Sequence, residues 1–351
     1  MALELQQHTT TLQSQEKRAP VTTFIRDTFF PEVETYLTED VVVEYSKGGQ
    51  LVAPFVAPNV GGLNIEREGY IAKRYTTPRV APQRPLSPEI LKQRLQGESV
   101  HSKMSEAERA KKILAKDAQK LDEQITRREE LMSAQLLTTG KIEVKGYMDD
   151  AQTQYVDESV DYKHTQRILL TGTDVWGGAA AKPYDDVGRG CEMVMKSGHD
   201  PRYAILGVES YKRLLDDANF LKKLDISNLA IARIAPTLRI KDGQGIKYLG
   251  FISEFGIDLY AYYAWYFDKE QKKQVPYIPD NKVAIAPEKI GGFLYGAITQ
   301  MNQAEELETY EGTRITKVWA RQESDTKMLR ISSRPLAKPD DVDSWTIIDT
   351  F

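Results

Sequence analysis

The most regular pattern of apolar and polar positions in the chain lies between residues 105 and 138. Ser105 and Glu108 have the spacing of a capping box, which marks a helix start. Gly140 supplies the residue that commonly follows a helix end. Apolar side chains recur mostly at steps of three and four residues, which predicts one helix of roughly 50 Å. They are Ala107, Ala110, Leu114, Ala118, Leu121, Ile125, Met132 and Leu136.

This apolar stripe is interrupted near Arg128 and Glu129. We therefore expect one turn of the helix to face solvent or to contact polar groups. A helix of this length exceeds the usual globular range, so it is either a coiled coil or a spine against which other elements pack. Because the stripe covers only about four heptads and contains a break, we favour the spine.

The second half of the chain predicts a mixed α/β unit. A helix over "YDDVGRGCEMVMKSG", a buried strand over "DPRYAILGV" and an amphipathic helix over residues 209–224 follow one another. Residues 257–286 predict three strands, the first alternating on one face from Ile257 to Trp265, with a charged turn at Asp268–Lys273. Further strands are predicted at Val41–Tyr45, at 140–148 and in the tail, 313–351.

Residues 50–88 form an apolar segment that is interrupted by prolines. Six of the sixteen prolines of the chain lie there. Since proline has no N–H to donate, this segment cannot lie inside a sheet, and we expect an extended excursion with a ribbon that turns near Glu68–Gly69. Its apolar side chains would be too exposed on a single subunit, which favours an arm that contacts a neighbour. A loop folded back on its own domain remains the alternative.

Composition narrows the class of protein. A chain of 351 residues suggests two or more domains or one elaborate domain, and a net charge of -4 gives no sign of general nucleic-acid binding. No apolar run approaches the roughly 20 residues that cross a bilayer, and the N-terminus lacks the pattern of a secretory signal. Cys191 is the only cysteine, which excludes an intramolecular disulfide and fits a reducing cytoplasm.

Candidate catalytic groups are sparse. The four histidines have no metal-ligand spacing, Cys191 has no evident thiolate partner, and "TTGK" and "GRGCEM" lack the glycines of nucleotide-binding loops. Asp185 and Asp186 could act as acid and base, but their place at a helix start is better explained by the helix dipole. Basic residues and tyrosines at 67–79 favour contact with an acidic protein surface over DNA, because the local basic excess is small. We therefore predict no catalytic, cofactor-binding or metal-binding residues.

Several stretches, taken in order, resemble one family. They are "TFIRDTFFP", "TEDVVVE", "APFVAPNVGG", "REGYIAKRYTTPRVAP", "LLTTGKIEV", "YDDVGRGCEMVMKSG", "YAILGVESYKRLL" and "VPYIPDNKVAIAP". No single stretch is diagnostic, but the colinear series covers essentially the whole chain. The chain resembles the lambda-type major capsid proteins of tailed bacteriophages.

That resemblance implies an α+β architecture, the Hong Kong-type phage capsid fold. Its parts would be an N-terminal arm (1–45), an extended loop called the E-loop (46–88), a peripheral domain with the spine helix (89–170 and 301–351) and an axial domain (171–300). Gln50–Gly62 would then be one rail of the E-loop, laid over an adjacent subunit.

The resemblance also implies a structural function without enzymatic activity or a cofactor. Copies of the chain would form hexamers and pentamers, and these would form the icosahedral head shell that encloses double-stranded DNA without sequence-specific binding. The implied partners are a separate scaffolding protein and protease, since no extra N-terminal domain is evident, a portal protein and, in some relatives, a decoration protein. Assembly would take place in the cytoplasm of the bacterial host, without a membrane, and the product would be the virion.

Candidate contacts between subunits lie in the arm and the E-loop. They are Phe24, Phe29, Phe30, Pro54, Phe55, Val56, Arg67, Tyr70, Lys73, Arg74, Tyr75 and Arg79. Some relatives form covalent cross-links through a lysine of this loop, for which Lys73 is the candidate, but the chain resembles the branch that does not.

Two other functions are compatible with parts of the pattern. An encapsulin-like compartment would use a related shell, close without a scaffold and capture an enzyme as cargo. A soluble two-domain α/β enzyme would use Asp185 and Asp186 in a pocket and form a discrete small oligomer. The scarcity of histidine and cysteine constellations and the long extended segment argue against the enzyme.

Overall fold

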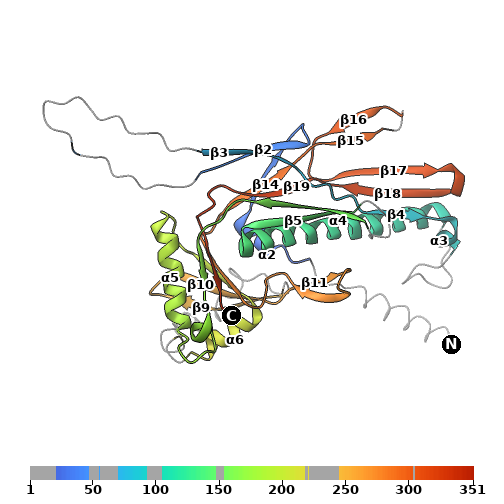
Figure 1. Cartoon of the computed structure of the whole chain (residues 1–351). Coiled ribbons are helices and arrows are strands. Elements are labelled where there is room, and N and C mark those ends of the chain that lie inside the picture. Colours follow the sequence, from blue (N-terminus) through green and yellow to red (C-terminus); the bar gives the residue numbers. More distant parts are fainter. Residues whose placement is uncertain are drawn as a thin grey trace, which may run out of the picture.

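The computed structural model describes residues 21–46, 55, 70–92, 105–147, 154–217, 220, 245–302 and 305–351. Its body is built on one long helix, α4 (Glu106–Thr139), and on a sheet near the C-terminal end of that helix (Figure 1). Two-stranded hairpins project from this body. The mixture of a few helices and many strands agrees with the expected α+β class.

The helix α4 begins and ends where the sequence predicts. Ser105 Oγ accepts a hydrogen bond from the Glu108 N–H (3.3 Å), and the Glu108 carboxylate accepts one from the Ser105 N–H (3.0 Å), which completes the capping box. Gly140 ends the helix with a φ of 70°, a conformation that glycine adopts without a steric penalty.

Other elements pack along α4, so the prediction of a spine is confirmed. Its neighbours come from both ends of the chain, and its buried residues lie mostly in its C-terminal half. These neighbours include α2 (Phe24–Phe29), α3 (Pro88–Lys92), β4 (Gln83–Leu86), β5 (Lys141–Tyr147), β18 (Thr326–Ser332) and β19 (Pro335–Pro339).

The largest sheet has six strands of mixed direction. Its central strand β8 runs parallel to β10 and antiparallel to β13. The helices α5 (Pro183–Lys196) and α6 (Val208–Leu215) pack against it, after a short 3-10 turn at Gly172–Asp174. In spatial order the strands are β7 (Arg167–Leu169), β20 (Thr346–Asp349), β13 (Lys282–Ala286), β8 (Tyr203–Leu206), β10 (Ile257–Tyr262) and β9 (Ile246–Ile252).

The prediction of a strand from Ile257 to Trp265 with apolar residues on only one face is wrong. Strand β10 ends at Tyr262, and every one of its residues is buried, because neighbouring elements cover both faces of this central strand. A separate hairpin, β11 (Trp265–Asp268) and β12 (Lys273–Pro276), follows and turns at the predicted charged segment. The region therefore holds four strands, β10 to β13, instead of three.

A smaller sheet joins three distant parts of the chain. Strand β14 (Gly291–Tyr295) lies between β1 (Glu32–Thr35), which is parallel to it, and β19, which is antiparallel. At Gly291 a Cβ atom would lie 2.0 Å from the Lys338 carbonyl oxygen, so only glycine allows the two backbones this approach.

The remaining strands form hairpins. The strands β2 (Asp40–Ser46) and β3 (Tyr70–Thr76) pair over their full length, and β18 pairs with both β17 (Ile315–Arg321) and β4. A short 3-10 turn, Gln322–Ser324, connects β17 to β18. The other two hairpins are β5 with β6 (Tyr155–Asp161), and β15 (Ile298–Met301) with β16 (Leu307–Tyr310).

The structure corrects two further predictions, one about a strand partner and one about the end of a helix. A ribbon turning at Glu68–Gly69 would pair Tyr70–Thr76 with the residues just before it, whereas this segment pairs with Asp40–Ser46. The helix predicted over 209–224 ends at Leu215, since Asp216 and Asp217 are not helical. Pro85 lies in β4, an edge strand, where its missing N–H leaves no partner unsatisfied.

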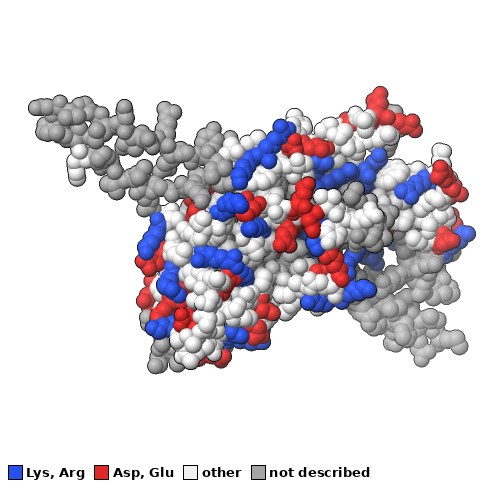
Figure 2. Space-filling view, in the orientation of Figure 1, with Lys and Arg blue, Asp and Glu red and all other residues white. Residues whose placement is uncertain are grey.

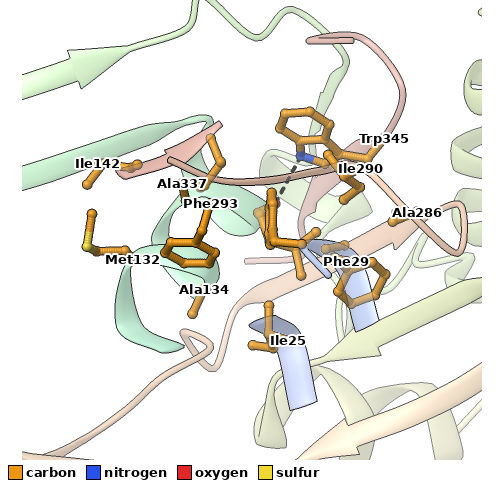
Figure 3. Packing of buried hydrophobic residues seen from close by; sticks show 14 of the residues in the cluster. Ile25, Phe29, Met132, Ala134, Ile142, Ala286, Ile290, Phe293, Ala337 and Trp345 are labelled. Carbon is orange, nitrogen blue, oxygen red and sulfur yellow. Dashed lines mark hydrogen bonds between the residues drawn. The ribbon is translucent and has the colours of Figure 1, made fainter. Parts of the chain in front are cut away.

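The main core lies where α2, α4 and the smaller sheet meet. Ile25 and Phe29 of α2 face Phe293 of β14, and Trp345 closes the cluster from the other side (Figure 3). The Trp345 indole N–H donates to the Leu137 carbonyl oxygen (3.1 Å), so its only polar atom is satisfied within the core. The N-terminal residues from Phe24 onward are thus part of the body.

The strand pairing suggests a revision of the predicted domain division. Strand β20, from the tail that was expected in the peripheral domain, lies in the six-stranded sheet beside β13. Strands β14 and β15, which were expected in the axial domain, pair with β1, β19 and β16 instead. We therefore propose that residues from about 291 belong with the peripheral elements and that Thr346–Asp349 belong with the axial ones.

Candidate assembly surfaces

The β2–β3 ribbon has one face on the body and one face open. Val41 and Val43 are buried, and Tyr75 is half-buried with its ring centroid 6.0 Å from that of Tyr162. On the opposite face Val42 is 52% exposed, and it pairs with Arg74 across the ribbon. The ribbon is therefore anchored by one set of side chains and presents the other set outward.

Polar contacts also hold the base of the ribbon. Asp40 accepts a hydrogen bond from the Thr76 hydroxyl (2.7 Å) and pairs with Arg74 at 2.6 Å. The Thr76 hydroxyl and the Arg74 guanidinium lower the pKa of the Asp40 carboxyl. Because this pair is exposed, it orients the ribbon more than it stabilises the fold.

The predicted contact residues that the structure describes differ in how exposed they are. Phe55 is fully exposed, Arg74 and Arg79 are exposed, and Lys73 and Tyr75 are half-buried toward the body. Tyr70 is the first residue of β3. Three candidates lie outside the described residues, namely Pro54, Val56 and Arg67.

The aromatic residues of α2 and its C-cap require a correction. Phe29 and Phe30 are 0% and 1% exposed and belong to the chain's own core. A neighbouring subunit cannot reach them, so we remove both from the candidate contacts. Phe24 is half-buried, with its ring centroid 5.4 Å from that of Tyr260.

At the interruption of its apolar stripe, α4 contributes charged side chains to a buried polar junction. The Glu129 carboxylate, fully buried, accepts hydrogen bonds from two nitrogens of Arg314 (2.7 and 2.9 Å), from Arg26 Nη1 (2.9 Å) and from the Tyr295 hydroxyl (2.9 Å). The nearby carboxylate raises the pKa of Arg314. Four donors around one carboxylate satisfy the charge that burial would otherwise make costly.

Glu130 binds the start of α2. Its carboxylate oxygens accept hydrogen bonds from the backbone N–H groups of Ile25 and Arg26, both at 3.0 Å, and from the Tyr262 hydroxyl. Burial raises the pKa of Glu130 to about 7 from 4.5, although these donors act in the opposite direction. The junction thus ties the N-terminal segment, the spine helix and the six-stranded sheet together. The break in the stripe predicted a turn that faces solvent or contacts polar groups, but no local pattern indicated which partners it would have.

The residues considered for catalysis do not form a site. Asp186 is buried and accepts a hydrogen bond from the Trp176 indole N–H (2.9 Å), whereas Asp185 is exposed. Burial raises the pKa of the Cys191 thiol to about 12, so it is a poor source of thiolate. His164 is stacked on the Trp345 ring. Among the described residues, no cluster of three or more histidine, cysteine or acidic side chains could hold a metal ion.

The length and apolar character of the described helices can be compared with the expectation that no segment crosses a membrane. None of them is both long and apolar enough to span a bilayer.

Three solved structures with a similar fold are described as capsid proteins of phages or of a prophage. A protein assigned as a prophage capsid protein of E. coli CFT073 superimposes with a TM-score of 0.67 at 16% identity, covering 94% of each chain. The capsid of Ralstonia phage GP4 gives a TM-score of 0.55 at 11% identity, covering 96% of this chain and 92% of the other. The mature capsid of bacteriophage PhiM1 gives 0.50 at 9% identity, covering 95% and 89%. These similarities establish the capsid fold.

A comparison of sequences assigns the family. No curated protein sequence matches the chain. The profile of the family described as "Phage major capsid protein E" matches residues 8–349, nearly the whole chain. The expected resemblance to phage capsid proteins is confirmed, and with it a structural family instead of an enzyme family. The chain belongs to the phage major capsid protein E family.

Proposed function

We propose that copies of this chain assemble into hexamers and pentamers and then into an icosahedral head shell around double-stranded DNA. The observation that carries the proposal is the β2–β3 ribbon, which has an anchored face and an open face bearing Val42 and Arg74. Its paired ends, Ser46 and Tyr70, lead into residues 47–69, which include the fully exposed Phe55. An apolar side chain presented in this way is typical of a surface that another subunit covers.

Assembly of this kind works through many repeated contacts. Each subunit presents different surfaces to its neighbours, and rotation closes these heterologous contacts into rings. Single contacts can be weak, because a subunit held by several neighbours gains avidity. A separate scaffolding protein and protease, a portal protein and, in some shells, a decoration protein complete the proposed set of partners. The shell would form in the cytoplasm of the bacterial host and become part of the virion.

Electron microscopy tests the proposal directly. The chain is expressed with its neighbouring genes and imaged by negative stain, and we expect closed polyhedral particles. Nuclease-protected DNA inside particles made during infection would support the head shell, whereas enzyme cargo would favour the encapsulin-like compartment. If only small discrete oligomers form with a scaffold present, the proposal is wrong.

A truncation tests the role of the ribbon itself. Because Ser46 lies opposite Tyr70, residues 47–69 can be replaced by Asn-Gly, which closes a two-residue hairpin. We expect the free energy of unfolding of the separate subunit to change by no more than about 0.5 kcal/mol, and closed shells to be lost.

A matched control replaces residues 47–69 with a glycine–serine segment of equal length. This variant keeps the spacing between Ser46 and Tyr70 but removes the apolar side chains, so it too should fail to form shells. Normal particles from either variant would exclude this segment as an assembly contact. A deletion through Arg84 is unsuitable as a test, because β3 and β4 both pair with other strands.

A further inference from the structure

The sheet β17–β18–β4 has one face on the spine helix and one face turned away from it. Leu329 and Ile331 of β18 pack with Leu121 and Ile125 of α4, which defines the inner face. Arg330 lies between Leu329 and Ile331 in β18, so its side chain belongs to the opposite face of the sheet. Lys317 pairs directly with Arg330 and therefore shares that face. We call the face that bears Arg79, Lys317, Trp319 and Arg330 the outer face.

The outer face gathers positive charge around one aromatic ring. The Arg330 guanidinium lies 5.3 Å from the centroid of the Trp319 ring, and Lys317 Nζ lies 5.5 Å from it. Burial lowers the pKa of Arg330, and the neighbouring Arg79 lowers it further. Two guanidinium groups and an ammonium group thus share a small area, where each raises the cost of the others.

No carboxylate compensates this charge within the part of the chain that the structure describes. None of Arg79, Lys317 and Arg330 forms an ion pair with a described residue, although Arg84 on the inner face pairs with Asp117 at 2.8 Å. Arg330 Nε is buried and has no hydrogen-bond partner in the described structure, and Arg330 Nη2 reaches Gln300 Oε1 only at 3.4 Å. Among the described residues, these three cations therefore have no acceptor of opposite charge.

The hairpin β15–β16 carries the complementary charge. Glu305, Glu306 and Glu308 are exposed, and Leu307 beside them is 75% exposed. Figure 2 shows acidic side chains gathered on this hairpin, with Lys and Arg side chains below it over β17 and β18. Exposed carboxylates that flank an exposed leucine are suited to a partner surface that offers cations around an aromatic ring.

The charged side chains of the two surfaces that the structure describes do not pair with each other. Gln300, one ladder pair away from the pair that borders the turn, reaches Arg330, and Glu308 lies opposite Gln300 in the ladder. Even so, no ion pair joins a carboxylate of this hairpin to the outer face among the described residues. Two complementary surfaces on one chain that do not pair internally can pair between copies, head to tail.

We propose that the outer face of the β17–β18–β4 sheet binds the acidic hairpin β15–β16 of a neighbouring copy. This inference rests on the proposed function, since it names one of the contacts through which copies assemble. The carboxylates of Glu305 and Glu306 would pair with Arg79 and Lys317, which would offset the repulsion between Arg79 and Arg330. Because the charges are near the surface, the contact should weaken as salt concentration rises.

A charge-swap experiment tests this contact. The first variant carries Glu305→Lys with Glu306→Lys, the second carries Arg79→Glu with Lys317→Glu, and the third combines all four changes. The fraction of subunits in shells is measured by sedimentation and electron microscopy. We expect each of the first two to reduce shell formation about tenfold or more, and the combined variant to restore most of it.

The control variant is Glu143→Lys with Glu323→Lys, which changes the net charge by the same amount at two exposed positions. It should assemble like the unaltered chain. The melting temperature of the separate subunit is measured for every variant. It should not fall, because the proposed pair forms only between copies, and it should rise where Arg79→Glu removes the repulsion of Arg330.

Three results would overturn the inference while leaving the proposed function in place. They are normal shells from the first variant, failure of the combined variant to restore assembly, and a lower melting temperature of the separate subunit, which would indicate a pair within one chain. If the unaltered chain itself forms no shells, the proposed function fails and this contact fails with it.

Discussion

The central strands of the six-stranded sheet and the projecting hairpins differ in what covers them. Every residue of β10 and β13 is buried. In contrast, Leu307 of β16 is 75% exposed and Phe267 of β11 is 61% exposed. The sheet is covered by helices and strands of its own chain, whereas no described residue covers these two hairpin side chains. In a capsid protein, this difference separates the surface that stabilises the subunit from the surface available to other copies.

The spine helix belongs to the first region but contains an exception. Most of its buried residues are apolar, yet Glu129 and Glu130 are fully buried. Their donors come from α2, from β10, from β14 and from the segment before β17. Buried charge of this kind contributes less to stability than apolar packing but fixes how the elements are oriented. Three predictions test the comparison, from the largest effect on the subunit to the smallest.

The largest effect is expected from Leu121→Pro in α4. Leu121 is 1% exposed and packs against Leu329, so the change breaks the helix and also removes core packing. We expect the free energy of unfolding to fall by about 3 kcal/mol or more, measured by chemical denaturation of the separate subunit. Lys111→Ala, at an exposed position of the same helix, should change it by no more than about 0.5 kcal/mol. An unchanged melting temperature for Leu121→Pro would contradict the role of the spine.

An intermediate effect is expected from pH at the polar junction. Because burial raises the pKa of Glu130 to about 7 from 4.5, the folded chain holds this proton more tightly than the unfolded chain. This group therefore favours folding at low pH, and its contribution decreases as pH rises from 4.5 to 7, by on the order of 3 kcal/mol at most.

The measurement compares the unaltered chain with Glu130→Gln in denaturation curves at pH 5 and pH 8. The loss of stability with rising pH should be smaller in Glu130→Gln, which has no proton to release. Tyr262→Phe removes a donor to Glu130, so it should raise the pKa further and increase the loss. Parallel pH profiles for all three proteins would show that Glu130 does not titrate in this range.

The smallest effect on the subunit is expected at the hairpin. Leu307→Ala should change the free energy of unfolding by no more than about 0.5 kcal/mol, because Leu307 is already exposed, but it should weaken shell formation. The same substitution at Leu136, which is 0% exposed, should cost about 2–5 kcal/mol. Equal losses of subunit stability at the two positions would remove the distinction between the regions.

Local signals in the sequence predicted many of the elements. The capping box, the apolar stripe and Gly140 located α4 to within one residue at each end. The series of short matching stretches led to the capsid family, which a profile over residues 8–349 confirms. Predictions based on a single strand or helix face were less successful. The alternation from Ile257 to Trp265 suggested a half-exposed strand, but packing on both sides decides burial, and a single sequence carries no record of it.

Pairing between strands and between charged residues that are distant in the chain could not be predicted from the sequence, for the same reason. Nothing in residues 70–76 indicates that their partner is Asp40–Ser46, since antiparallel register depends on where the two segments meet in space. The polar turn at Glu129 was visible as a gap in the stripe, but its partner Arg314 lies 185 residues away. Phe29 and Phe30 were predicted as contacts between subunits because an aromatic cluster near an arm fits either a core or an interface.

By itself, the sequence determined the spine helix, the α+β class and the capsid family, because caps, periodicity and the order of short stretches are local properties of the chain. The tertiary structure decided which apolar side chains are covered within the subunit and which charged groups meet. It buried Phe29, left Leu307 exposed and placed Arg79 beside Arg330 without a described carboxylate. Burial and charge compensation depend on residues that are distant in the chain and adjacent in space, and only the fold brings them together.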